Sequence, residues 1–139
     1  MYAGREQVSP HAGRDCAKDV YAQAGITDPR KDFDCAEVYV PFSWYEPMWL
    51  ENLGFAEPGK GWELTMSGAT SLDEGGDIPW NCSGGVLSSN AIGASGMIRF
   101  AEAARQVRGS AEDHQVEGAK KALGHAYGCL LYTSPSPRD

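Results

Sequence analysis

Apolar residues recur at helical spacing in three stretches of the chain, residues 12–24, 42–53 and 94–108. The spacing predicts three helices. Pro47 fits the second helix only if it lies in the first turn, where its missing N–H breaks no hydrogen bond. A glycine, which ends helices by adopting a left-handed conformation, follows each stretch: Gly25, Gly54 and Gly109.

The third helix has the most regular apolar stripe. Its position predicts that Met97, Phe100, Ala101 and Ala104 point into the core, and that Phe100→Ala costs ~3–5 kcal/mol. The second helix is unusually aromatic, and its large side chains either pack in the core or form a wall of a ligand site: Trp44, Tyr45 and Trp49.

Two shorter stretches have the composition of strands. Residues 33–40 and 121–127 are rich in β-branched, aromatic and small apolar residues. Residues 55–80 contain many glycines and prolines and are expected to be mainly loop, with a helical turn possible at 61–66.

Composition narrows the class of function. The 139 residues carry a net charge of −7 without a run of Lys or Arg, which argues against a surface for nucleic acid or anionic membranes. No apolar stretch approaches the ~18 residues of a membrane span, and residues 1–10 lack the apolar core of a signal peptide. The four cysteines match no zinc spacing, so reduced thiols, a cytoplasmic location and no bound metal are expected.

A segment rich in Gly and Ser, residues 81–96, leads directly into the third predicted helix. We call it the Gly/Ser loop. Glycines let a ligand approach the backbone, and free N–H groups at a helix start can bind an anion. The alternative is an ordinary flexible loop, in which Cys82 is a plain small side chain rather than a reactive thiol. The residues expected to contact a ligand are Ser83, Gly84, Gly85, Ser88, Gly93 and Ser95.

This loop resembles the segment Asn-x-Ser-Gly-Gly…His-Pro-x-Gly-Ala-(Ser/Thr)-Gly of the thiolase superfamily, particularly its branch of sterol-carrier and lipid-transfer proteins. Thiolase-like proteins bind acyl-CoA at the junction of two similar domains, and a cysteine of the first domain is the nucleophile. The resemblance therefore implies a C-terminal thiolase-like α/β domain, with a mixed sheet covered by packed helices. It also implies a coenzyme A thioester as substrate, no covalently bound cofactor, and a homodimer. Further segments follow the family's order: residues 24–29, 37–42, 51–55, 102–109 and 115–119.

The chain departs from this pattern at the residues that carry the chemistry. The His-Pro pair of the family corresponds to Asn90-Ala91, and an amide is no base, although it can donate to an oxyanion. The two other motif positions correspond to Tyr39 and Tyr127. Each phenol either transfers protons or is a packed ring with its hydroxyl hydrogen-bonded. Tyr39, Asn90 and Tyr127 are the predicted catalytic residues, expected to line one concavity.

The departures leave three functions open. The chain could belong to an acyltransferase that forms or cleaves carbon–carbon bonds of acyl-CoA. It could instead resemble the branch that cleaves acyl-CoA side chains by a retro-aldol reaction together with a small OB-fold partner. The third alternative is a non-catalytic lipid-transfer or assembly subunit. Because the nucleophile domain has no counterpart here, the chain alone is expected to be inactive.

The last residues do not continue the family pattern. Residues 129–139 resemble the translation of a sequencing-library adapter, with a genuine Pro/Ser-rich tail as the alternative. We therefore expect a partial thiolase-like domain over residues 1–128 and a non-native tail that makes few contacts with it.

Overall fold

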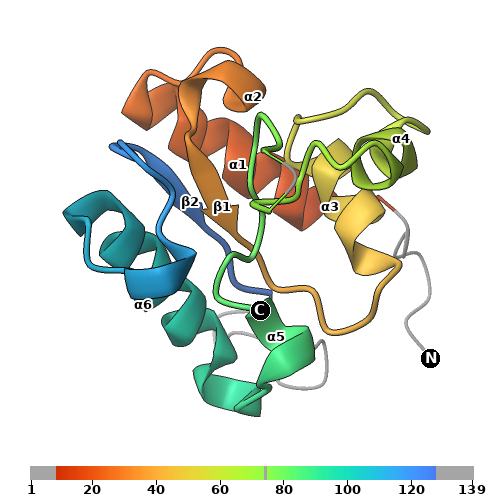
Figure 1. The fold of residues 1–139 in the computed structure, drawn as a ribbon. Coiled ribbons are helices and arrows are strands. Elements are labelled where there is room, and N and C mark those ends of the chain that lie inside the picture. The colour runs from red at the N-terminus through yellow and green to blue at the C-terminus, as the bar shows by residue number, and fades with distance from the viewer. Residues whose placement is uncertain (1–8, 74, 128–139) are drawn as a thin grey trace, which may run out of the picture.

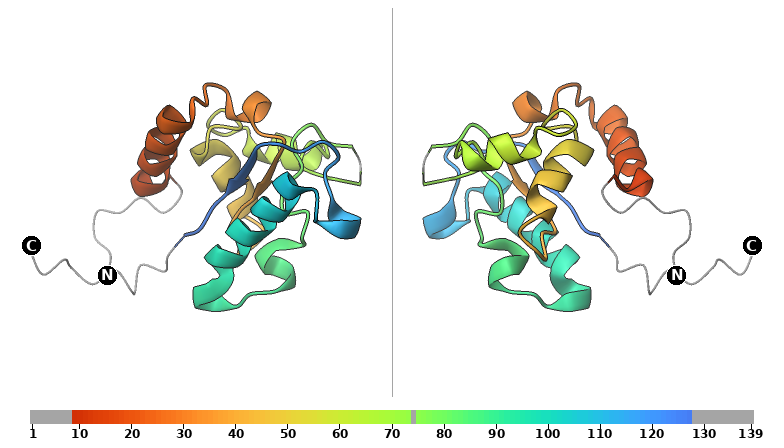
Figure 2. Two further views of the ribbon diagram at one scale, coloured as in Figure 1. Left: turned by 90° about the vertical axis from the view of Figure 1, so that its left-hand side faces the viewer. Right: turned by 90° about the vertical axis from the view of Figure 1, so that its right-hand side faces the viewer.

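The computed structural model describes residues 9–73 and 75–127, which form layers around a small parallel sheet (Figure 1). Helices α1 and α3 lie on one side of the sheet and α6 lies on the other (Figure 2). The order of elements is α1 (His11–Ala24), α2 (Pro29–Asp32), β1 (Cys35–Glu37), α3 (Tyr45–Asn52), α4 (Gly61–Met66), α5 (Gly85–Ser88), η1 (Ile92–Ala94), α6 (Ser95–Arg108), η2 (Glu112–His114) and β2 (Ala122–Gly124).

The sheet is built around β1. This strand pairs in parallel with β2, with Cys35 opposite Ala122. On its other side, Ala36 forms a parallel bridge with Trp80, so β1 lies between two neighbours and is buried along its whole length. Both predicted strands exist but are shorter than expected. Beyond Glu37 the ladder stops, because Val38 donates its N–H to a side chain, Asn81 Oδ1 at 2.7 Å, rather than to a strand.

The main core lies between the sheet and the layer of α1 and α3. Helix α3 begins at Tyr45, so Pro47 does lie in its first turn. Trp49 and Leu50 are completely buried, which confirms the core interpretation for the centre of this helix, whereas Trp44 is 50 % exposed. The buried residues of this core are Ala17, Ala36, Val38, Val40, Met48, Trp49, Leu50, Leu53, Phe55, Ile78 and Trp80.

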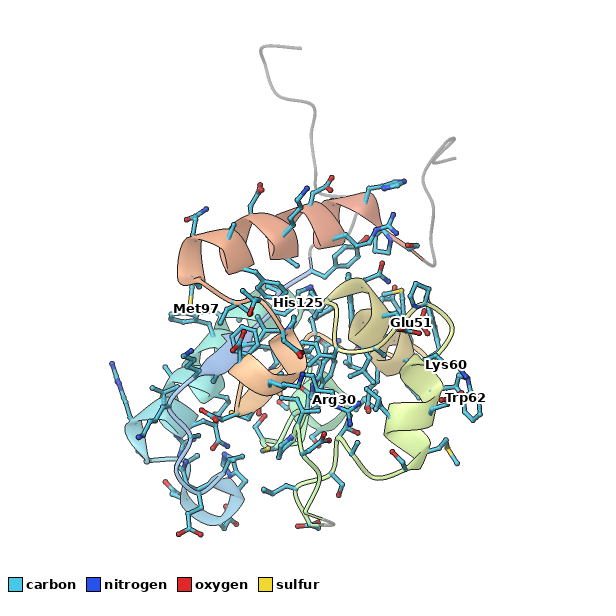
Figure 3. All side chains as sticks on the ribbon, turned by 90° about the horizontal axis from the view of Figure 1, so that it is seen from above. Arg30, Glu51, Lys60, Trp62, Met97 and His125 are labelled. Carbon is cyan, nitrogen blue, oxygen red and sulfur yellow. The ribbon has the colours of Figure 1, made fainter. Side chains whose placement is uncertain are left out.

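The long connection after α3 contains the expected helical turn, α4. Gly61 opens this helix in a space where a Cβ would lie 2.2 Å from the carbonyl oxygen of Pro47, so no larger residue fits without a shift. Lys60 and Trp62 project outward at α4, while His125 lies inside, beneath α1 (Figure 3).

Helix α6 has the predicted length, but the prediction of its buried face was wrong. Met97 is 70 % exposed and Phe100 is 63 % exposed, and Ala101 is exposed as well. Ala104 is half-buried. The helix instead turns a largely polar face inward: Ser95, Arg99, Ala103 and Gln106.

The reason for this orientation is the close approach of α6 to β2. A Cβ on Gly124 would lie 3.2 Å from the Cα of Phe100, and one on Gly96 would lie 2.5 Å from the Cβ of Ala126. Small residues at the contact bring the helix backbone close to the strand, and the inward polar side chains find hydrogen-bond partners. The apolar stripe is left on the outside.

Phe100→Ala is therefore expected to change the free energy of unfolding of this chain by less than ~1 kcal/mol, because an exposed side chain leaves no cavity. Phe55→Ala is the matched control. Phe55 is 3 % exposed, and its truncation should cost ~3–5 kcal/mol. Urea unfolding of both variants checks this, and a large cost for Phe100→Ala alone would show that the apolar stripe is covered in solution.

The prediction that residues 129–139 form a tail with few contacts concerns residues outside the described ranges.

Candidate functional site

The carboxyl ends of β1 and β2 point to the end of the molecule that also holds α5 and the start of α6 (Figure 1). Ligands of open α/β sheets bind at this end of parallel strands. Tyr39 follows β1, Tyr127 follows β2, and Asn90 lies between α5 and η1. The topology thus brings all three predicted catalytic residues to one end of the sheet.

Trp49 connects the two tyrosine segments. Its indole Nε1 donates a hydrogen bond to the carbonyl oxygen of Tyr39 at 3.1 Å, and its ring meets that of Tyr127 edge-on at 5.0 Å. Tyr39 and Tyr127 are both half-buried. A fully buried core residue therefore fixes the backbone of one tyrosine and the ring of the other.

Asn90 is exposed and held by its own carbonyl group. Its Oδ1 accepts hydrogen bonds from the Ile92 N–H at 3.0 Å and from Ser95 Oγ at 2.8 Å. These two bonds fix the plane of the amide, so its donor Nδ2 lies on the opposite side. Among the residues that the structure describes, no hydrogen bond or ring contact joins Asn90 to Tyr39 or Tyr127. Their common concavity stays a prediction.

The Gly/Ser loop makes a tight turn over β1. Gly84 and Gly85 both have positive φ, 85° and 62°. A Cβ on Gly85 would lie 3.0 Å from the side chain of Asn81, whose backbone N–H donates to the Ala36 carbonyl at 2.8 Å. Asn81 thus bonds to β1 through its backbone and to Val38, directly after β1, through its side chain. These bonds join the turn to the edge of the sheet.

Of the six loop residues predicted to contact a ligand, Gly84 is exposed and Gly85 is buried. The other four divide into two pairs. Ser83 and Ser95 use their hydroxyl groups in hydrogen bonds within the protein, so they hold the loop in place. Ser88 and Gly93 are exposed, and no atom lies within 4 Å of a Cβ built on Gly93. Contact of these residues with a ligand stays a prediction.

A buried ion pair that was not predicted from the sequence lies beneath this loop. Arg99 Nη1 lies 2.8 Å from Glu37 Oε2, and the two side chains are 3 % and 1 % exposed. Ser83 donates to both carboxylate oxygens, through Oγ at 2.8 Å and through its N–H at 3.0 Å. Burial raises the pKa of the Glu37 carboxyl, while the Ser83 hydrogen bonds and Arg99 lower it. In the sequence, Glu37 is the signal for such a pair. It is a carboxylate inside an otherwise apolar strand, and a buried charge is expected to have a partner.

His125 is a titratable group two positions before Tyr127. Its ring lies 4.4 Å from that of Trp49, and Nδ1 is buried without a hydrogen-bond partner among the described residues. Burial lowers the pKa of His125 to about 4. The imidazole is therefore neutral at physiological pH.

The stability of the chain is expected to fall as the pH is lowered from about 6.5 to about 4, because the unfolded chain then binds a proton that the folded His125 does not. The loss from this group should be about 1–3 kcal/mol, flattening below pH 4. His125→Gln removes this contribution. The difference between the two curves of unfolding free energy against pH isolates it, and parallel curves would contradict the assignment.

The thiols near the site are not activated. Burial, with Glu37 nearby, raises the pKa of Cys82 to about 11, and burial raises that of Cys35 to about 12. Of the two alternatives for Cys82, the raised pKa favours an unreactive small side chain over a reactive thiol. Within residues 9–73 and 75–127, no three His, Cys, Asp or Glu side chains gather as they would around a metal ion. No helix in these ranges is both long and apolar enough to cross a bilayer.

The fold is an α/β domain, and its candidate site lies at the carboxyl edge of parallel strands. Residues 2–136 match the thiolase C-terminal domain-like family. The chain belongs to this family, which confirms the predicted resemblance and the α/β class with packed helices. In the described residues the sheet is parallel rather than mixed.

Curated relatives include both enzymes and carrier proteins. The acetyl-CoA acetyltransferase of Methanothermobacter thermautotrophicus is 38% identical over 113 residues, which cover 81% of this chain and 28% of that protein. Sterol carrier protein 2 of Homo sapiens is 36% identical over 116 residues, covering 83% of the chain and 20% of that protein. The 17-hydroxy-3-oxo-4-pregnene-20-carboxyl-CoA lyase of Mycobacterium tuberculosis is 34% identical over 93 residues, covering 67% of the chain and 22% of the lyase.

A solved structure has the same fold. The Ltp2-ChsH2(DUF35) aldolase superposes with a TM-score of 0.73 at 29% identity, over 85% of this chain and 29% of that one. The chain thus spans between a fifth and a third of the length of these proteins. It is a thiolase-like domain related to proteins that act on CoA thioesters.

Proposed function

We propose that this chain is the C-terminal part of an enzyme that cleaves or forms a carbon–carbon bond in a CoA thioester, and that cleavage by a retro-aldol reaction is its chemistry. The observation that carries the proposal is the pair Tyr39 and Tyr127, both in contact with Trp49 at the carboxyl end of the strands. The lyase and the aldolase among the similar proteins support this direction of the reaction.

The reaction needs three functions from the protein. A base removes the proton of a 3-hydroxyl group, the bond between C2 and C3 breaks, and C3 leaves as a carbonyl compound. The electron pair of the broken bond becomes the enolate of the shortened CoA thioester, which is then protonated at C2. Tyr39 and Tyr127 are the candidates for the two proton transfers, and the Nδ2 of Asn90 is the candidate donor to the enolate oxygen.

The Gly/Ser loop would bind the CoA thioester. Gly84, Ser88 and Gly93 are exposed and leave room for a ligand, whereas Gly85 is buried against Asn81 and shapes the turn. Ser83 and Ser95 act indirectly, because their hydroxyl groups hold the loop and Asn90 in place. No covalently bound cofactor is required.

The outward face of α6 offers a surface for the remainder of the longer protein, which we call the parent. Met97, Phe100 and Val107 form an exposed apolar stripe on this helix, 70 %, 63 % and 43 % exposed. An apolar stripe of this kind commonly marks an interface. If the other thiolase-like domain of the parent covers it, Phe100→Ala should cost ~3–5 kcal/mol there, in contrast to this chain alone. A homodimer, a small OB-fold partner and a cytoplasmic location stay proposals for the parent.

The test uses the parent, obtained by extending this sequence into the neighbouring genomic sequence. Incubation with 3-hydroxyacyl-CoA thioesters should release a carbonyl compound and a shortened acyl-CoA, detected by mass spectrometry. Asn90→Ala should lower turnover by ~10²–10³-fold, because it removes one donor to the enolate oxygen. Ser110→Ala, an exposed position beyond α6, is the control and should leave turnover unchanged.

The other outcomes identify the alternatives. Transfer of an acyl group to free CoA, with a reactive cysteine in the upstream domain, would indicate an acyltransferase. Tight binding of acyl-CoA or lipid without any turnover would indicate a non-catalytic transfer or assembly subunit. Either outcome would contradict the retro-aldol proposal.

A further inference from the structure

Glu37 joins the three segments that carry the candidate catalytic residues. Its carboxylate binds Ser83 at the start of the Gly/Ser loop and Arg99 in α6. Its carbonyl oxygen accepts the N–H of His125 at 2.9 Å, just before Tyr127. Glu37 itself lies two positions before Tyr39. One residue therefore contacts the loop, the segment after β2 and helix α6.

Arg99 extends this junction to Asn90. The guanidinium Nη1 donates to Glu37 Oε2 and to Ser83 Oγ, both at 2.8 Å. One helical turn earlier, Ser95 donates to Asn90 Oδ1 at 2.8 Å. The same inward face of α6 thus holds the start of the Gly/Ser loop, at Ser83, and Asn90 further along it.

Folding stability is a poor explanation for this pair. Taking two charges out of water costs a great deal, and apolar side chains of similar volume are often as good or better for stability. The pair is also not fully satisfied, because Arg99 Nε is buried without a partner among the described residues. What the pair provides and apolar residues would not is directional bonding to Ser83, which starts the turn at Gly84 and Gly85.

We propose that Arg99 and Glu37 are positioning residues. They fix the Gly/Ser loop relative to β1, so that Asn90 and Tyr39 are held at a defined separation across the site. They act on the reaction only through these residues and do not touch the substrate. This inference rests on the proposed function for its effect on turnover, but not for its effect on the loop.

The experiment replaces the pair as a whole. In the parent, the double variant Glu37→Met and Arg99→Met keeps similar volume and leaves no unpaired charge, so it should fold with a melting temperature near that of the wild type. Turnover should fall by about 10–100-fold, because small misplacement of catalytic groups has effects of this size. The KM should change by less than about 3-fold, since the exposed contacts to CoA remain.

The matched control is Gln106→Met on the same face of α6. Gln106 is as deeply buried as Glu37, but it binds His114 and Val116 at the opposite end of the helix. The Gln106→Met variant should have a lower melting temperature and unchanged turnover. Turnover within about 3-fold of the wild type in the double variant would overturn the proposal, because the pair would then be structural only.

A second measurement does not depend on activity. Amide hydrogen exchange over residues 83–95 should become at least about 10-fold faster in the double variant, and stay unchanged in Gln106→Met, if the pair orders the loop. If the wild-type parent shows no turnover, the proposed function fails, and exchange alone decides the positioning role. Unchanged exchange in the double variant would overturn it.

Discussion

Replacing Tyr127 by Phe in the parent is expected to lower the turnover of 3-hydroxyacyl-CoA by ~10²–10⁴-fold. The change removes one hydroxyl group and keeps the ring that packs edge-on against Trp49, so the melting temperature should stay the same. Tyr39→Phe should have an effect of the same size, because retro-aldol cleavage needs both a base and an acid. Steady-state kinetics with a single thioester measures both variants.

Tyr21→Phe is the control for these substitutions. Tyr21 donates its hydroxyl proton to the Leu53 carbonyl at 2.9 Å, between α1 and α3 and away from the loop. Its replacement removes the same group and should lower stability without changing turnover. Normal turnover in both Tyr127→Phe and Tyr39→Phe would mean that the two rings are structural, and the retro-aldol mechanism would lose its proton-transfer groups.

Trp49→Ala is expected to destabilise the chain by ~3–5 kcal/mol. The side chain is completely buried and packs against the rings of Tyr45, His125 and Tyr127. Its removal leaves a large cavity and also deprives the Tyr39 carbonyl of its donor. Chemical denaturation followed by far-UV circular dichroism gives the loss directly.

Trp62→Ala separates burial from residue type. Trp62 is 56 % exposed on α4, and its Nε1 bonds only to the nearby Gly59 carbonyl. Its truncation should cost less than ~1 kcal/mol. Equal losses for the two tryptophan variants would contradict the packing described for α3.

The helix boundaries could be predicted from the sequence because their signals are local. Gly25 and Gly109 end α1 and α6 in the left-handed conformation that glycine adopts readily. The segments of the candidate site were also predictable, because their sequences resemble those of a known family in the same order. A family resemblance places motifs on a fold even where the chemistry of individual residues differs.

The orientation of α6 could not be predicted in the same way. Hydrophobic spacing identifies the buried face only when the core is apolar, whereas α6 turns Ser95, Arg99 and Gln106 toward the sheet. Arg99 and Glu37 are 62 positions apart, so nothing in either local sequence indicates that they pair. A polar helix face can be identified as the buried face only when the residues that it contacts are known.

The pairing of β1 with β2 has a consequence for how the site forms. Asp34 Oδ2, just before β1, accepts hydrogen bonds from the backbone N–H groups of Lys120 and Lys121, 86 and 87 positions later in the chain. Contacts of such long range close last and slow folding. A nascent chain still attached to the ribosome can form α1 and α3, but it cannot bring Tyr127 next to Trp49 until β2 has been synthesised. Until then, the apolar surfaces that will become the core and the site are open to chaperones and to aggregation.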